Sequence, residues 1–133
     1  MKKVGCVLLI DDDESTNFIN EIVIDNEGCA EKVLSIDSGE HALKLLNSLK
    51  AEEALRPDLI FLDVNMPGMN GWEFLQEYEQ LPQKTRENSV VIMLTTSPNP
   101  DDKHRAEGIP EVKEFVNKPL TGEMIREIIA EHF

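Results

Sequence analysis

Residues 59–63 are Leu-Ile-Phe-Leu-Asp, four consecutive apolar residues followed directly by a carboxylate. A short run of this kind is typical of a strand buried on both faces, as in a parallel sheet that helices cover on both sides. Four other runs of strand length, rich in aliphatic and β-branched residues, occur at 7–10, 32–36, 90–94 and 114–117. We therefore expect five strands.

Amphipathic stretches with helical spacing separate these runs. The first has Phe18, Ile19, Ile22 and Val23 on one face, which predicts a helix with this apolar face, an N-cap at Ser15 or Thr16 and an end at Gly28. Similar apolar faces predict helices around 42–49, 72–78 and 124–129, and a shorter polar helix is expected at 101–107.

Five strands that alternate with five helices predict an α/β fold, a (βα)5 doubly wound sandwich, because crossovers between parallel strands are right-handed. No linker-like tract interrupts residues 1–133, so we expect one domain without an output domain. Ligands of such sheets bind at the carboxyl ends of the strands. The residues that follow the apolar runs are therefore the candidate site.

The charge and composition of the chain argue against several classes of partner. Its 133 residues include 13 Lys and Arg against 26 Asp and Glu, a formal net charge of −13. Nucleic-acid binding depends mainly on Lys and Arg, so we expect no nucleic-acid partner. The two cysteines fit a reduced, cytoplasmic setting. No apolar stretch approaches the roughly 20 residues that span a bilayer, so no membrane association is expected.

Polar side chains follow four of the five apolar runs. They are Asp11, Asp12 and Asp13 after the first run, Asp63 after the third, Thr95 after the fourth and Lys118 after the fifth. Any one of them alone fits a turn or a helix cap equally well. Carboxylates crowded at one edge repel one another, and a divalent cation with oxygen ligands relieves that repulsion. Together they predict a Mg²⁺ site.

Asp63 has the chemistry of a nucleophile at such a site. A carboxylate can attack a phosphoryl group and form an aspartyl phosphate if positive charge neutralises the phosphoryl oxygens. Mg²⁺ and the Lys118 ammonium would supply that charge, and the Thr95 hydroxyl would donate a hydrogen bond. The chain has no glycine-rich nucleotide loop of the GxxxxGK[ST] or GxGxxG type, so the expected donor is a protein or a small phosphodonor.

These segments resemble the receiver domain of two-component response regulators. The resemblance rests on 8–13, 61–71, Leu94-Thr95-Thr96 and Val116-Asn117-Lys118-Pro119, and it covers essentially the whole chain. It implies a flavodoxin-like, five-stranded parallel sheet in the order 2-1-3-4-5. It also implies a bacterial phosphorelay protein that catalyses only its own phosphorylation and dephosphorylation.

The resemblance implies phosphoryl transfer from a histidine kinase or a phosphotransfer protein to Asp63. Mg²⁺ would be held by the carboxylates of Asp12 and Asp63, with Asp11 as the other member of the acidic pair, and by the backbone carbonyl of Asn65. Lys118 would bind the phosphoryl group and precede a cis peptide bond to Pro119. Asp13, one residue past the pair, is predicted to start the helix.

The resemblance also implies a switch and an output surface. Thr95 would move toward the phosphoryl group while Phe115 rotates inward, and Asn65 and Ser97 would tune the lifetime of the phosphoryl group. The fourth helix, fifth strand and fifth helix would form the output face. We therefore expect a monomer or a weak dimer through that face. It would act on a downstream protein target that the sequence does not name, or serve as a phosphate shuttle or sink.

Two other classes of function are alternatives to a receiver domain. Phosphatases of the haloacid-dehalogenase type also use an aspartyl nucleophile and Mg²⁺, but they need a second Asp two residues later, where this chain has Asn65. A phosphorylation-independent scaffold would not need an intact set of Asp12, Asp63, Thr95 and Lys118.

Overall fold

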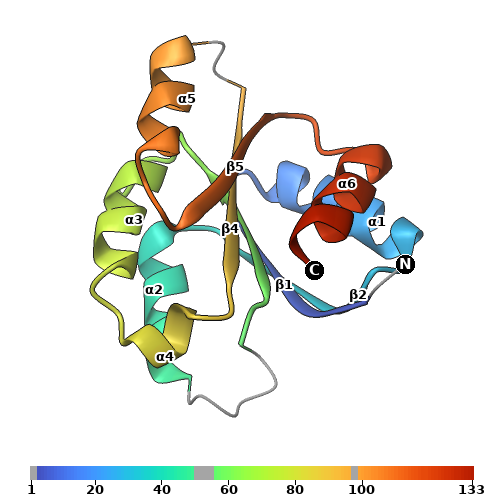
Figure 1. Cartoon of the computed structure of the whole chain (residues 1–133), viewed down its shortest axis with the longest axis horizontal. Coiled ribbons are helices and arrows are strands. Elements are labelled where there is room, and N and C mark those ends of the chain that lie inside the picture. The colour runs from blue at the N-terminus through green and yellow to red at the C-terminus, as the bar shows by residue number, and fades with distance from the viewer. Residues whose placement is uncertain (1–2, 50–55, 97–98) are drawn as a thin grey trace.

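The computed structural model describes residues 3–49, 56–96 and 99–133. A five-stranded parallel sheet lies between two layers of helices (Figure 1). Its strands are β1 (Val4–Ile10), β2 (Ala30–Ile36), β3 (Leu59–Asp63), β4 (Val90–Thr95) and β5 (Val112–Asn117). The sheet order β2-β1-β3-β4-β5 confirms the predicted topology.

The helices divide between the two faces of the sheet. They are α1 (Glu14–Glu27), α2 (Gly39–Ser48), α3 (Gly71–Tyr78), α4 (Gln83–Arg86), α5 (Pro100–Glu107) and α6 (Gly122–His132). In Figure 1, α1 and α6 lie on one side of the sheet and the other four helices lie on the opposite side. None of the helices in the described parts of the chain is long and apolar enough to cross a bilayer.

The core consists of one apolar cluster on each face of the sheet. Trp72, Phe74, Leu75 and Tyr78 pack α3 against the sheet, which confirms the apolar face expected for this helix. The cluster on the other face joins α1 and α6 to β1, β3 and β4. All five residues of β3 are buried, as expected for a central strand covered on both sides.

The strand register brings the candidate residues together. Ile10 is paired with Leu62, so Asp11 and Asp63, which follow them, lie at the same level of the sheet. Thr95 ends β4 one residue beyond the partner of Asp63. The carboxyl ends of β1, β3, β4 and β5 therefore form one polar edge.

The apolar face expected for α1 is wrong for Phe18, Ile19 and Ile22, whereas its fourth residue, Val23, packs against the core cluster on this side of the sheet. Phe18, Ile19 and Ile22 are 63%, 55% and 44% exposed, whereas the buried residues of this helix are Asn17, Asn20 and Ile24. The N-cap is Asp13 rather than Ser15 or Thr16. Asn17, one of the two buried polar residues of α1, donates a hydrogen bond to the backbone of Asp11. Hydrophobic spacing cannot predict such a bond.

The structure contains one helix, α4, in addition to the five that the sequence predicts. It is a single turn that follows Pro82 and has no buried residue. A segment with no apolar face leaves no hydrophobic periodicity to detect. Helices α2, α3, α5 and α6 agree with the prediction. The agreement includes the N-cap of α6 at Thr121, which accepts a hydrogen bond from the Met124 backbone.

Candidate functional site

Asp63 ends β3 and is 6% exposed. Its backbone is closely covered by the start of α3, since a Cβ on Gly71 would lie 2.6 Å from the Asp63 carbonyl oxygen. The Gly71 amide also donates to the Val64 carbonyl at 2.9 Å. Glycine at position 71 thus lets α3 begin directly against the strand end that presents Asp63.

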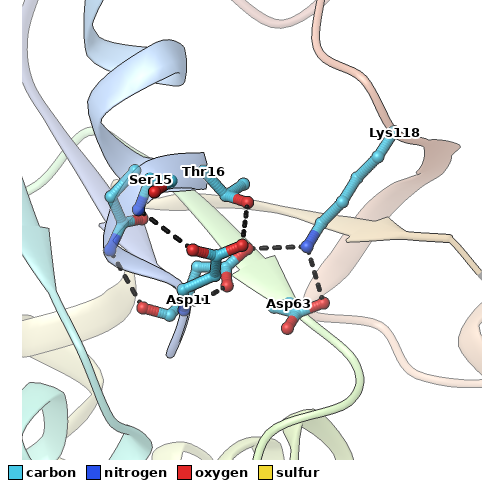
Figure 2. Close-up of polar contacts among 7 residues, drawn as sticks. Asp11, Ser15, Thr16, Asp63 and Lys118 are labelled. Atoms are coloured by element: carbon cyan, nitrogen blue, oxygen red, sulfur yellow. Dashed lines mark hydrogen bonds and ion pairs between the residues drawn. The ribbon is translucent and has the colours of Figure 1, made fainter.

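Lys118 connects two buried carboxylates. Its Nζ lies 2.6 Å from Asp11 Oδ2 and 3.1 Å from Asp63 Oδ1 (Figure 2). The Lys118 backbone amide donates to the Thr95 carbonyl at 2.8 Å, and the bond to Pro119 is cis, as the resemblance implied. The ends of β1 and β3 therefore meet at the Lys118 ammonium, and the end of β4 is bonded to the Lys118 backbone just past β5.

The two buried charges shift each other's titration. Burial raises the pKa of Asp63, and the nearby Asp11 carboxylate raises it further, although Lys118 acts in the opposite direction. Burial disfavours the charged form of Lys118, but the hydrogen bond from Lys118 to Asp11 and the charge of Asp63 outweigh it, so the pKa of Lys118 lies above its usual value. Lys118 is thus held in the charged form that can bind an anion.

Asp11 has a partner at each of its polar atoms. Its amide donates to Ile36 O at 3.1 Å, and its carbonyl accepts from Asn17 Nδ2 at 2.9 Å. Its Oδ1 accepts from the Asp13 amide at 2.9 Å, and its Oδ2 accepts from Lys118. Asp11 is therefore a fixed carboxylate that holds both the lysine and the turn into α1.

Asp12 differs from Asp11, although it is the next residue. It is exposed, and its carboxylate makes no hydrogen bond or ion pair with any residue that the structure describes. Carboxylate oxygens of Asp11, Asp12 and Asp63 nevertheless lie within 4.8 Å of one another. Three hard oxygen donors at this spacing fit Mg²⁺, which binds through a few carboxylates and keeps several waters.

Asp13 is outside this acidic cluster and caps α1. Its Oδ1 accepts from the Ser15 amide, and its Oδ2 accepts from Thr16 Oγ1 at 2.9 Å. The hydrogen bond from Thr16 is the largest of the effects that lower the pKa of Asp13. The prediction of a helix-start residue is confirmed.

The remaining site residues occupy different environments. Thr95 is fully buried at the end of β4. Phe115 is half-buried on β5, opposite Met93, and packs against the apolar cluster on the α2 and α3 face. Asn65 is exposed, and Ser97 lies outside the described residues.

Two features beside the site were not predicted. One is Asn17, a buried amide that holds Asp11. The other is an open hollow of about 1160 Å³ that is lined by Asp12, by Phe18 and Ile19 of α1, and by the segment from β2 to α2. The sequence signal that could have identified Asn17 is the presence of a polar residue inside an apolar helical pattern.

The chain is similar to known signalling proteins. A family model described as the response regulator receiver domain matches residues 7–130. The transcriptional regulatory protein AfsQ1 of Streptomyces coelicolor is 32% identical over 90% of this chain, and the chain spans about half of that protein, 47% of its length.

Solved structures cover the chain almost completely. A two-component response regulator from Cytophaga hutchinsonii aligns with a TM-score of 0.90 and 37% identity, over 98% of this chain and 97% of the other. A response regulator receiver protein from Dyadobacter fermentans aligns with a TM-score of 0.87 and 28% identity, over 96% and 97% of the two chains.

Proposed function

Because the chain belongs to the response regulator receiver domain family, we propose that it accepts a phosphoryl group on Asp63 from a phosphohistidine of a histidine kinase or of a phosphotransfer protein. The observation that carries this proposal is the position of Lys118 Nζ, 3.1 Å from a carboxylate that ends the central strand. In the transfer, a P–O bond to an Asp63 oxygen forms while the P–N bond to the donor imidazole breaks.

Lys118 and Thr95 have separate tasks in this proposal. Lys118 is charged and lies beside the nucleophile, so it would bind an oxygen of the incoming phosphoryl group. Thr95 ends the neighbouring strand, where its hydroxyl would donate to another oxygen and report the phosphorylated state. Phe115 on β5 would follow Thr95 by turning further into the core.

Mg²⁺, when bound, would neutralise phosphoryl oxygens as charge redistributes during transfer. The carboxylates of Asp11, Asp12 and Asp63 would hold it, and by resemblance to the family the Asn65 carbonyl would add a ligand. Asn65 and Ser97 would also control the access of water to the aspartyl phosphate.

The exposed side of α1 is the proposed docking surface for the phosphodonor. Phe18, Ile19 and Ile22 are the exposed large apolar residues of the described chain, and exposed apolar residues grouped on one helix favour an interaction site. Phe18 and Ile19 line the same hollow as Asp12, so a protein bound there would lie next to the cation site.

We propose that the output surface is the face formed by α5, β5 and α6. Phe115 lies on β5 in this face, so a change in its packing would alter the surface. The chain would act in the cytoplasm by contact with a downstream protein, as a monomer or as a weak dimer through this face.

Acetyl phosphate tests the proposal without a cognate kinase. The wild-type chain is incubated with acetyl phosphate and Mg²⁺ and analysed by intact mass spectrometry, alongside Asp63→Asn and the exposed control Asp101→Asn. We expect one phosphoryl adduct on the wild type and the control, and none on Asp63→Asn. An adduct that persists in Asp63→Asn, or none on the wild type, would contradict the proposal. Multiple turnover of phosphate esters would instead favour a phosphatase.

A further inference from the structure

Asn17 is a buried polar residue of α1 that neither the helix nor the apolar core requires. It is 5% exposed and is one of five buried polar or charged residues in the described chain. Three of the others, Asp11, Asp63 and Thr95, belong to the site described above. The burial of a polar side chain is unfavourable unless hydrogen bonds compensate, so the bonds that Asn17 makes indicate its role.

The amide of Asn17 closes the turn between β1 and α1. Its Nδ2 donates to the Asp11 carbonyl oxygen at 2.9 Å. That carbonyl belongs to the peptide bond between Asp11 and Asp12, so the hydrogen bond fixes the orientation of the peptide group from which Asp12 continues. The Asp11 side chain is held separately by Asp13 and Lys118.

Asp12 depends on the backbone for its position. Its carboxylate has neither a hydrogen-bond partner nor an ion-pair partner among the described residues, yet it lies with those of Asp11 and Asp63 inside one group of potential ligands. A carboxylate without side-chain partners is oriented by its own main chain. The bond from Asn17 to the preceding carbonyl fixes this main chain on one side of Asp12, and the bond from the Asp13 amide to Asp11 Oδ1 fixes it on the other.

The oxygen of the Asn17 side-chain amide, Oδ1, unlike its nitrogen, is left without a hydrogen bond from the described residues. This oxygen is buried. A buried acceptor without a partner is destabilising, and an apolar side chain would avoid that loss. The use of Asn at this position is thus explained by the Nδ2 contact at the turn rather than by packing.

We infer that Asn17 is a positioning residue for the divalent cation, which holds the peptide bond between Asp11 and Asp12 so that the Asp12 carboxylate faces Asp11 and Asp63. The inference rests on the proposed function, because it assumes that these three carboxylates bind Mg²⁺. Groups that orient metal ligands without touching the metal typically affect affinity by about 10- to 100-fold.

Asn20 provides a matched control for the test. It is also an asparagine of α1, is also 5% exposed and faces the same side of the helix, but no hydrogen bond from it to Asp11 is found in the described chain. Wild type, Asn17→Leu and Asn20→Leu are titrated with MgCl₂ by isothermal titration calorimetry, well below the thermal midpoint of each. The thermal midpoint of each chain is also measured with and without saturating Mg²⁺.

We expect Asn17→Leu to bind Mg²⁺ about 10-fold more weakly than wild type, and Asn20→Leu to bind within twofold of it. A given concentration of Mg²⁺ should then raise the thermal midpoint of Asn17→Leu less than that of Asn20→Leu. A residue that only supports the fold would change the midpoint without changing the affinity of the folded chain.

The inference is overturned if folded Asn17→Leu binds Mg²⁺ within twofold of wild type. If circular dichroism shows Asn17→Leu unfolded, Asn17→Ala takes its place with the same criterion. Loss of the fold in both Asn17 variants, with Asn20→Leu folded, would assign Asn17 a structural role and overturn the inference too. Wild type that does not bind Mg²⁺ would instead overturn the cation site of the proposed function, on which the inference rests.

Discussion

The ammonium nitrogen of Lys118 lies 2.6 Å from Asp11 and 3.1 Å from Asp63, so two buried carboxylates share one ammonium group. Asp11 is fixed by further hydrogen bonds from Asn17 and Asp13. The contact with Asp63 is the longer of the two, and no further side-chain hydrogen bond of Asp63 is found in the described parts of the chain. Lys118 is therefore anchored at Asp11 and stands beside Asp63.

Lys118→Met is expected to destabilise the chain at neutral pH by roughly 3 kcal/mol, because it leaves two buried carboxylates without their counter-ion. It should also abolish or greatly slow phosphorylation by acetyl phosphate. Urea denaturation and intact mass measure the two effects. Lys113→Met is the matched control, since Lys113 lies on β5, the strand that Lys118 directly follows, is exposed and donates to the Pro110 carbonyl. An equal loss in both variants would contradict this role for Lys118.

Asp63→Asn is expected to stabilise the chain at neutral pH. Burial and Asp11 raise the folded-state pKa of Asp63, so keeping it ionised costs stability above the unfolded-state pKa. The gain from Asp63→Asn should therefore shrink as the pH falls below the ordinary pKa of aspartate, where both states are protonated. Denaturation midpoints measured from neutral to acidic pH, without Mg²⁺, test this.

Asp13→Ala should show the opposite sign. Hydrogen bonds, that from Thr16 first, lower the folded-state pKa of Asp13, so its charge contributes stability above the unfolded-state pKa, and that contribution is lost as the pH falls through the folded-state pKa. Asp13→Ala should therefore destabilise the chain at neutral pH and less so in acid. These assignments would be refuted if both variants changed the free energy of unfolding with the same sign at neutral pH, or if both changes shifted in the same direction as the pH falls.

Gly71→Ala is expected to destabilise the chain by about 1–3 kcal/mol, because the new Cβ would meet the Asp63 carbonyl oxygen at 2.6 Å and the Val64 Cα at 3.0 Å, both backbone atoms. It should also slow phosphorylation, since relief of the clash displaces Asp63 or α3. At Gly108, by contrast, a Cβ would lie 3.5 Å from its nearest neighbour. Gly108→Ala should therefore retain near-wild-type stability and phosphorylation, and urea denaturation with intact mass compares the two variants.

Trp72 is expected to report movement of α5. It is the single tryptophan of the chain, and the Arg105 guanidinium of α5 lies 4.5 Å from the centre of its ring. If the phosphorylated state shifts α5, beryllofluoride with Mg²⁺ will change the Trp72 fluorescence, and Arg105→Gln will reduce that change. An equal response in wild type and Arg105→Gln would show that this contact does not report the switch.

Phe115 is expected to move further into the core under the same conditions. Its ring is half-buried and packs at the margin of the cluster on the α2 and α3 face, so inward rotation would bury more apolar surface. Side-chain NMR of Phe115 with and without beryllofluoride measures the change. An unchanged ring environment would end the assignment of Phe115 to the switch.

The sequence was sufficient for the sheet and for the grouping of Asp11, Asp63, Thr95 and Lys118, because strand ends in a parallel sheet share one edge. It was not sufficient for α1. Hydrophobic spacing favoured a face with Phe18, whereas the buried face contains Asn17, whose hydrogen bond to Asp11 is a contact between elements. Periodicity contains no information on such contacts.

The pair formed by Lys118 and Asp11 joins residues 107 positions apart in the chain. The positively charged side chain of the site, Lys118, thus belongs to one of the last segments of the domain to be synthesised. A nascent chain that already contains β1 and β3 presents its acidic residues without a counter-ion until β5 is in place. Under the proposed function, the competence to accept a phosphoryl group would consequently arise only with completion of the whole sheet, and phosphorylation of Asp63 would then be a chemical probe of complete folding.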